Sequence, residues 1–324
     1  MISQIRLHRP ASDRPKDLPV GVVIPVYNRR TLLLETLPFV LAQTHAPERV
    51  VIVDDGSTDG SADAAEAWLA GQQPQFAWRV LRCPHRTAAA ARVDGFRLVD
   101  DLPLVAFLDS DDHWPSDFLE RTVAHLAANP EADAAVTDRR YIDAAGAEQA
   151  SDCSQMATDP FAWLFQHGAG IASCSLLRTA AVKAAGGWQP ELRTAEDAWL
   201  FGHVAMQGEW VHVPGEPVTF HLGNANSRNE DGNLSRRYAD TELRWVRVYQ
   251  QLYHLLGERR PDIDRRPLQA ALAKRWARAG KQMFRTGQAN LARECFSQAV
   301  YWNPTQLKSW GRLAISPFVR GQAA

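Results

Sequence analysis

The sequence predicts an α/β protein with a mostly parallel central sheet, followed by an α-helical extension. Three observations lead to this prediction. Short apolar runs rich in β-branched residues alternate with helix-spaced stretches in the first part of the chain. Strands that alternate with helices imply a largely parallel sheet that is covered on both faces. From Ser235 onward the sequence has a helical pattern only.

Five apolar runs are expected to be strands, at residues 20–25, 49–53, 78–82, 104–108 and 132–137. Four helix-spaced stretches separate them, at residues 31–43, 61–69, 87–99 and 118–128. Between residues 138 and 227 the pattern is irregular. There we expect helices near 161–166 and 195–206, and short strands near 171–177, 210–213 and 218–221. Ligands of such sheets bind beyond the carboxyl ends of the strands.

The expected organisation has three parts: a lead-in over residues 1–18, the α/β domain over 19–234, and a basic helical region over 235–324. Residues 273–306 of the helical region have the spacing of a tetratricopeptide repeat, although a plain helical hairpin remains open. One such repeat cannot bury its own apolar face, so it is expected to pack on the main domain or on another subunit. The residues that carry the spacing are Trp276, Gly280, Ala292, Phe296, Ala299 and Pro304.

The charge is spread unevenly along the chain. The formal net charge is −1, but residues 235–324 hold 17 Lys and Arg against 6 Asp and Glu, a net of 17 − 6 = +11. Such a region often meets an anionic partner, and a basic surface docked on its own acidic neighbour is the alternative. The four cysteines are far apart in the sequence and predict neither a disulfide framework nor a zinc site. No apolar stretch is long enough for a membrane span.

Two acidic clusters carry the chemistry, and each follows an expected strand. Residues 54–60 read Asp-Asp-Gly-Ser-Thr-Asp-Gly, which suits hydrogen bonds to a base or ribose, although such turns are also common without a ligand. Residues 109–112 read Asp-Ser-Asp-Asp. Carboxylates so close repel one another unless a cation neutralises them, and oxygen-rich sites suit Mg²⁺ or Mn²⁺ beside a diphosphate. The sequence has no phosphate-binding P-loop and no dinucleotide fingerprint after a strand.

Together with the Ile-Pro-Val-Tyr-Asn-Arg run at 24–29 and the Gln-Thr pair at 43–44, these clusters resemble family 2 inverting glycosyltransferases of the GT-A (nucleotide-diphospho-sugar transferase) fold. The resemblance covers roughly residues 19–227. It implies an enzyme that moves a sugar, with UDP the expected nucleotide, from a nucleotide-diphosphate donor to a glycan or lipid-linked acceptor. A bacterial surface polysaccharide is one such acceptor by family analogy.

The resemblance also implies roles for individual residues. Pro25, Tyr27 and Asp55 match positions that hold the base, with Asn28, Arg92, Asp109 and Ser110 as further donor contacts. Asp111 and Asp112 are the expected ligands of Mn²⁺ or Mg²⁺, and His221 matches a late histidine that touches the metal or diphosphate in some relatives. Asp197 matches the general base and Glu196 its partner. Trp188 and Trp199 are either core residues or a sugar platform.

The segment at 85–95 departs from the family pattern. It keeps Arg92 and Gly95 but loses a loop glycine and two asparagines, which puts the donor contacts of this loop in doubt. The alternatives are a non-catalytic glycan- or nucleotide-binding module, a nucleotidyltransferase, and a scaffold that acts through its basic tail. The expected location is the cytoplasm, with peripheral contact at the inner, anionic membrane face. We expect no nucleic-acid partner and leave a homo-oligomer open.

Overall fold

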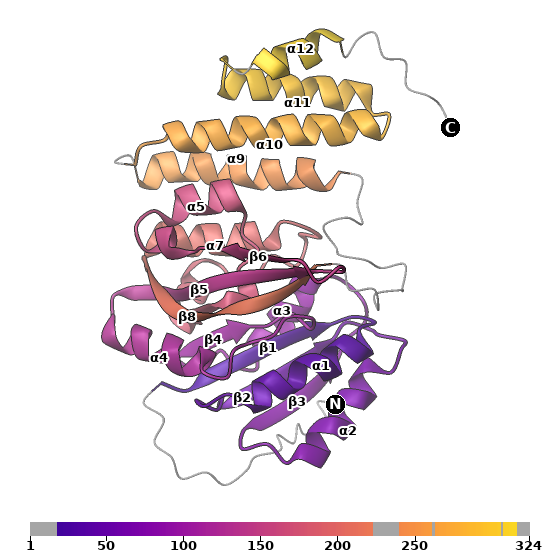
Figure 1. The fold of residues 1–324 in the computed structure, drawn as a ribbon, viewed down its shortest axis with the longest axis vertical. Helices are drawn as coiled ribbons and strands as arrows, with labels where there is room; N and C mark the ends of the chain where they lie inside the picture. Colours follow the sequence, from indigo (N-terminus) through magenta and orange to yellow (C-terminus); the bar gives the residue numbers. More distant parts are fainter. Residues whose placement is uncertain (1–17, 223–239, 261–262, 306, 316–324) are drawn as a thin grey trace.

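The computed structural model describes residues 18–222, 240–260, 263–305 and 307–315 of the 324-residue chain. A mixed eight-stranded sheet forms the centre, and helices are stacked above it at one end (Figure 1). The strand order is β3-β2-β1-β4-β7-β5-β6, with β8 paired to β5. The α/β class and the C-terminal helical part are therefore as predicted. The strands are β1 (Val20–Val26), β2 (Arg49–Asp54), β3 (Ala77–Arg82), β4 (Leu104–Phe107), β5 (Ala132–Asp143), β6 (Glu148–Ser151), β7 (Ser175–Arg178) and β8 (Glu209–Leu222).

The first four strands run parallel and are largely buried. β1 lies between β2 and β4, and all seven of its residues are buried, which accounts for its unbroken apolar sequence. In the register of the sheet, Val26 pairs with Asp54, and Asp54 pairs with Arg82. The segments that follow β1, β2 and β3 therefore leave the sheet at one edge.

The irregular second half completes the sheet with β5 to β8. β5 and β6 form a hairpin, and β7 pairs antiparallel with both β4 and β5. The two short strands expected near 210–213 and 218–221 are one long strand, β8. Its register against β5 shifts between Val213 and Val218, where Pro214 lacks an N–H and Gly215 has a φ of +133°. The sequence breakers therefore produce a bulge and do not end the strand.

The helices pack closely on the sheet and on one another. They are α1 (Arg30–Leu41), α2 (Ser61–Gln72), α3 (Ala88–Phe96), α4 (Phe118–Ala128), α5 (Pro160–His167), α6 (Thr179–Ala184), α7 (Glu196–Gln207), α9 (Thr241–Arg259), α10 (Arg266–Arg285), α11 (Ala289–Trp302) and α12 (Leu307–Ile315). On α3, a Cβ at Gly95 would lie 2.4 Å from the Val23 side chain of β1, so glycine is what allows this approach.

The C-terminal helices dock directly on the α/β half. A Cβ at Gly202 of α7 would lie 2.5 Å from Leu252 of α9, so these two helices are in close contact. From α10, the buried guanidinium of Arg275 donates hydrogen bonds to the backbone oxygens of Phe165 (2.9 Å) and Leu164 (3.3 Å) at the end of α5. The expectation that the helical region packs on the main domain agrees with these contacts.

Helices α10 and α11 form an antiparallel hairpin in the segment expected to resemble a tetratricopeptide repeat. A Cβ at Gly280 would lie 2.6 Å from the Phe296 ring, so the two helices approach closely at this glycine. The expected domain boundary at residues 234 and 235 lies outside the described residues. Among the helices that the structure describes, none is both long and apolar enough to cross a bilayer.

We expect Gly202→Ala to lower the free energy of unfolding by about 1–3 kcal/mol, because the added methyl group collides with Leu252 in the α7–α9 contact. Urea unfolding followed by circular dichroism measures the change. Gly71→Ala in α2 is the matched control, because nothing lies within 4 Å of its new Cβ. There, helix propensity should stabilise the protein by about 0.5–1 kcal/mol. Equal effects of the two substitutions would contradict tight docking of α9.

Candidate active site

One pocket of about 330 Å³ opens at the carboxyl edge of the parallel strands. It receives residues from the loops after β1, β2, β3 and β4, from the start of α7, from the end of β8 and from α9. Every site residue predicted from the sequence except Asn28 lines this pocket: Pro25, Tyr27, Asp55, Arg92, Asp109, Ser110, Asp111, Asp112, Glu196, Asp197 and His221. The structure therefore brings together residues that are up to about 200 positions apart in the sequence.

At one end of the pocket, Tyr27 and Asp55 surround His85. The Tyr27 and His85 rings are stacked, with centroids 3.9 Å apart and an interplanar angle of 14°. The Asp55 carboxylate accepts hydrogen bonds from His85 Nδ1 (3.0 Å) and from the Arg86 N–H (2.9 Å). Burial raises the pKa of Asp55, and these hydrogen bonds oppose the rise. Gly56 has a φ of +81°, and a Cβ there would lie 2.8 Å from the backbone nitrogen of His85. The loop after β2 and the loop after β3 therefore fit together only with glycine at this position.

Asn28, predicted as a donor contact, lies beside the pocket and joins two loops. Its N–H donates to Ser57 Oγ (2.9 Å), and its Oδ1 accepts from the Thr58 N–H (2.8 Å). Asn28 also adopts a φ of +50°, a region that asparagine tolerates better than most residues. In this structure it therefore fixes the loop after β1 against the loop after β2.

The aspartates after β4 have different environments. Asp109 accepts a hydrogen bond from Arg92 (2.7 Å), and Asp111 forms an ion pair with Arg29 (2.8 Å). Asp112 is 4% exposed and accepts a 2.5 Å hydrogen bond from Ser173 Oγ, which in turn accepts from the Asp109 N–H. Burial, then repulsion from the neighbouring aspartates, raises the pKa of Asp112 well above its ordinary value. Asp112 thus anchors the turn through Ser173, whereas the carboxylate of Asp111 is bound by the long side chain of Arg29.

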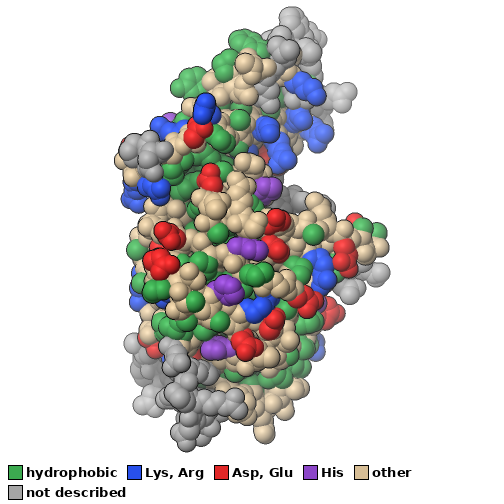
Figure 2. All heavy atoms as spheres, turned by 60° about the vertical axis from the view of Figure 1, so that its left-hand side comes forward, with side chains coloured by type: hydrophobic (Ala, Val, Ile, Leu, Met, Phe, Trp, Pro, Cys, Tyr) green, Lys and Arg blue, Asp and Glu red, His purple; other side chains and the backbone are tan. Residues whose placement is uncertain are grey.

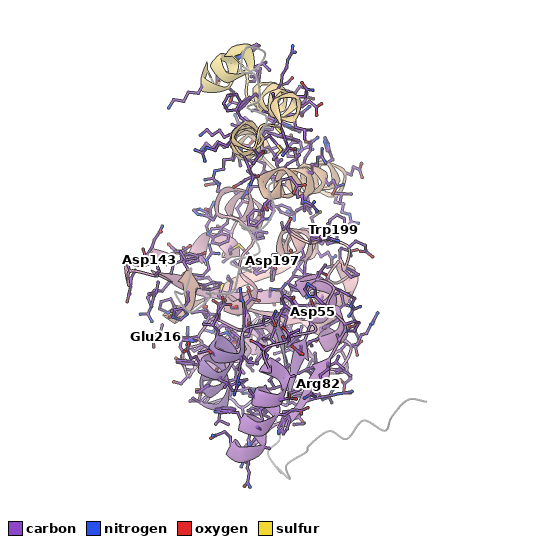
Figure 3. All side chains as sticks on the ribbon, turned by 90° about the vertical axis from the view of Figure 1, so that its right-hand side faces the viewer. Asp55, Arg82, Asp143, Asp197, Trp199 and Glu216 are labelled. Atoms are coloured by element: carbon purple, nitrogen blue, oxygen red, sulfur yellow. The ribbon has the colours of Figure 1, made fainter. Side chains whose placement is uncertain are left out.

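On the opposite wall, Glu196 and Asp197 begin α7. Ala195 before them has a φ of +67°, so the chain turns sharply into the helix. Asp197 Oδ1 is buried and has no hydrogen-bond partner among the described residues. Burial, then repulsion from Glu196, raises the pKa of Asp197 well above its ordinary value, and the charge of Arg92 opposes this. Figure 3 shows Asp197 and Asp55 towards the middle of the molecule, below the C-terminal helices.

Arg92 joins the two walls. Its guanidinium is 4% exposed, contacts Asp109 (2.7 Å) and Glu196 (3.2 Å), and lies 4.5 Å from the centroid of the Trp188 ring. These anions raise the pKa of Arg92 despite its burial, so the group stays charged. Trp188 is 3% exposed beneath it, and neither Trp188 nor Trp199 lines the pocket. Their geometry agrees with the core alternative and not with a sugar platform.

His221 reaches the aspartate turn from β8. Its Nδ1 lies 2.9 Å from the backbone oxygen of Asp111. A carbonyl oxygen can only accept, so Nδ1 is the donor in this contact, and in the neutral imidazole of this tautomer Nε2 has the lone pair that can bind a cation. A separate group, Asp138, Asp152 and His212, has side-chain ligand atoms within 4.8 Å of one another. None of these three residues lines the pocket.

The pocket also holds residues that sequence reasoning missed. Arg29 directly follows the Tyr-Asn motif, and its position there is the one signal that could have identified it. Trp245 reaches the pocket from α9, and its indole N–H is buried without a hydrogen-bond partner among the described residues. Arg193 lines the pocket from the loop before α7. Nothing in the local sequence around Trp245 indicated that the helical region contributes to the pocket.

Comparison with known proteins agrees with this architecture. The family described as "Glycosyl transferase family 2" matches residues 21–184, which is just over half of the chain. The chain belongs to glycosyl transferase family 2. The match includes the loops after the first four strands and ends before Glu196 and Asp197.

Individual relatives match a shorter part of the chain. Over 107 residues it is 34% identical to the putative teichuronic acid biosynthesis glycosyltransferase TuaG of Bacillus subtilis, covering 33% of this chain and 41% of TuaG. The chain spans less than half the length of the curated relatives it matches first.

Two solved structures share the fold at low identity. TarS 1–349 of S. aureus in complex with UDP-GlcNAc has a TM-score of 0.66 at 14% identity, covering 94% of this chain and 93% of TarS 1–349. The mannosyltransferase PcManGT of Pyrobaculum calidifontis, in complex with GDP-Man and Mn²⁺, has a TM-score of 0.55 at 19% identity, covering 94% and 84%. Likeness to TarS extends over the C-terminal helices as well as the sheet, since it covers nearly the whole chain.

Proposed function

We propose that this protein is a metal-dependent, inverting glycosyltransferase that moves a sugar from a nucleotide-diphosphate donor to a hydroxyl of a glycan or lipid-linked acceptor. The observation that carries the proposal is the pocket itself. Its donor-side aspartates face an unpartnered carboxylate oxygen of Asp197 across a bridge formed by Arg92. Family membership supports the reaction class.

The nucleotide binds at the end of the pocket formed by Tyr27, Asp55 and His85. An aromatic ring and a buried carboxylate suit a base that stacks and donates an N–H. Uridine is our first choice, because the solved relative with the highest TM-score named above, TarS, was crystallised with UDP-GlcNAc. PcManGT was crystallised with GDP-Man, so guanosine is the comparison to run beside it.

The donor set of the pocket suits a divalent cation. Asp111 offers a carboxylate oxygen and His221 offers Nε2 from the other side of the turn, and hard cations prefer oxygen-rich sites with substrate phosphates. Mn²⁺ or Mg²⁺ held there supplies positive charge that stabilises the leaving diphosphate. Asp112, which hydrogen-bonds to Ser173, supports the turn from behind in this scheme.

The sugar transfer is a single displacement. Asp197 accepts the proton of the acceptor hydroxyl, the oxygen bonds to the anomeric carbon, and the bond from that carbon to the diphosphate breaks. Glu196, paired with Arg92, keeps the first turn of α7 in place. Trp245 borders the acceptor side and offers its free indole N–H to a sugar oxygen.

The outer face of α10 suits contact with an anionic membrane. Lys274, Arg278, Lys281 and Arg285 are exposed at helical spacing, and among the described residues none has an ion-pair partner. The sequence of α10 contains no acidic residue. Figure 2 shows Lys and Arg gathered on the upper, helical part of the molecule, and Asp and Glu mostly below. We therefore propose that this face holds the enzyme at the inner leaflet, near a lipid-linked acceptor.

We expect Asp197→Asn to lower kcat by about 10²–10⁴-fold, because the amide cannot take the proton. The UDP affinity of this variant, measured by calorimetry, should equal that of the wild type. Since burial raises the pKa of Asp197, activity of the wild type should fall as the pH falls through a value above the ordinary aspartate pKa of about 3.9.

Glu191→Gln, at an exposed position in the loop before α7, is the control and should keep the wild-type profile. An Asp197→Asn enzyme that turns over at the wild-type rate would refute the assignment of the base.

Asp111→Asn should abolish the gain in UDP affinity that Mn²⁺ provides, because the amide is a much poorer ligand for a hard cation. Calorimetric titration of UDP with and without Mn²⁺ tests this. Asp112→Ala should instead lower the thermal midpoint, since it removes the partner of Ser173. If Mn²⁺ still strengthens UDP binding to Asp111→Asn, the metal lies elsewhere.

Replacing all four cations on the outer face of α10 with Gln should weaken binding to vesicles that contain phosphatidylglycerol by about 10²–10³-fold, since each cation near an anionic surface contributes about 1 kcal/mol. Co-sedimentation at low salt measures this. Arg82→Gln together with Arg97→Gln, both ion-paired on the sheet half, is the control and should leave binding unchanged. Equal binding of neutral and anionic vesicles would contradict the proposal.

A further inference from the structure

The ion pair between Arg29 and Asp111 occupies the position that the proposed metal needs. Arg29 Nη1 lies 2.8 Å from Asp111 Oδ1, and both side chains line the pocket. Guanidinium and a divalent cation compete for the same carboxylate oxygen, because each requires its lone pairs. Neither the family match nor the solved relatives assign a role to this arginine.

The backbone around Arg29 is held firmly. Its N–H donates to Ser61 Oγ (3.3 Å), and the next N–H, of Arg30, donates to the Asp59 carboxylate (2.9 Å). On the other side, Asn28 is bonded to the loop after β2. Any change in the contact to Asp111 therefore comes from rotation of the long Arg29 side chain and not from movement of the loop.

The two arginines that contact the aspartate turn differ in freedom. Arg92 is 4% exposed and is held by Asp109, Glu196 and the Trp188 ring. The Arg29 side chain is 26% exposed, and Asp111 is its one ion-pair partner within the described residues. Arg92 would lose two buried ion pairs and its contact with the Trp188 ring if it moved. Arg29 would lose one ion pair, the one with Asp111.

The diphosphate provides the alternative partner. A cation that bridges Asp111 and a phosphate oxygen places that oxygen about 4 Å or less from the carboxylate, which is two metal–oxygen bonds of about 2 Å. Arg29 already lies beside that carboxylate, so its guanidinium reaches the phosphate by side-chain rotation. Planar guanidinium groups bind phosphate oxygens in pairs with charge-assisted hydrogen bonds.

We infer that Arg29 is an exchangeable counter-ion: it neutralises Asp111 before loading and transfers to the donor diphosphate when the divalent cation takes Asp111. This inference rests on the proposed function, since it requires both the metal and the diphosphate. Its consequence is thermodynamic coupling. The cation alone binds weakly because it must displace Arg29, and the nucleotide strengthens cation binding because it gives Arg29 a new partner.

The test is a calorimetric titration of Mn²⁺ into wild type and Arg29→Gln, each with and without saturating UDP, followed by a titration of UDP into each protein with Mn²⁺ present. Without UDP, Arg29→Gln should bind Mn²⁺ about tenfold more tightly than wild type, because the competitor is gone. With Mn²⁺ present, Arg29→Gln should bind UDP about tenfold more weakly. UDP should therefore strengthen Mn²⁺ binding by a smaller factor in Arg29→Gln than in wild type.

Arg30→Gln is the matched control, since it removes the neighbouring charge from an exposed side chain that does not line the pocket. It should behave as wild type in every titration. A general loss of positive charge would also strengthen Mn²⁺ binding and weaken UDP binding, so the comparison with Arg30→Gln is what distinguishes exchange from it. Circular dichroism monitors folding.

Two results would overturn the inference, and they separate it from the proposed function. If wild type and Arg29→Gln bind Mn²⁺ equally, and UDP strengthens that binding equally in both, Arg29 is a static partner and the metal-dependent function stands. If Mn²⁺ binds neither protein even with UDP, the proposed metal dependence fails together with the inference.

Discussion

The buried guanidinium of Arg92 is the interaction on which the rest of the pocket depends. A charge at 4% exposure is expensive to desolvate, and here Asp109 and Glu196 offset that cost from two sides while Trp188 lies beneath it. Removing either acid would leave the buried guanidinium of Arg92 with one ion-pair partner in place of two. The loop after β4 and the start of α7 are therefore fixed relative to each other by one side chain, and with them the donor wall and the Asp197 wall.

The position of Asp197 depends in turn on the C-terminal helices. α7 carries Asp197 at its first turn, and α9 packs on α7 where Gly202 meets Leu252. The same α9 brings Trp245 into the pocket, while Arg275 of α10 caps the backbone oxygens at the end of α5. The helical region is thus a structural part of the pocket wall. This explains how the likeness to TarS can extend over nearly the whole chain.

The sequence predicted the features that depend on a local pattern and missed those that depend on contacts between residues far apart in the chain. Continuous apolar runs identified the parallel strands, and strand ends identified the edge where Asp55 and Asp109 emerge. No local pattern shows that Asp112 turns inward, because its partner Ser173 is 61 residues away. The stacking of His85 on Tyr27 is hidden for the same reason, and the single strand β8 was hidden by Pro214 and Gly215, which read as breakers.

The charge balance of the pocket explains why metal and donor should bind together. Carboxyl groups outnumber guanidinium groups along its walls, and burial raises the pKa values of Asp112 and Asp197 well above the ordinary range, because the ionised carboxylates are costly there. The arginines offset part of that negative charge, and Arg29 already pairs with Asp111. A divalent cation alone must displace Arg29 from Asp111, and a diphosphate alone adds negative charge beside the carboxylates, where an uncompensated charge is costly. Binding both together adds little net charge, so the pocket favours the pair over either ligand.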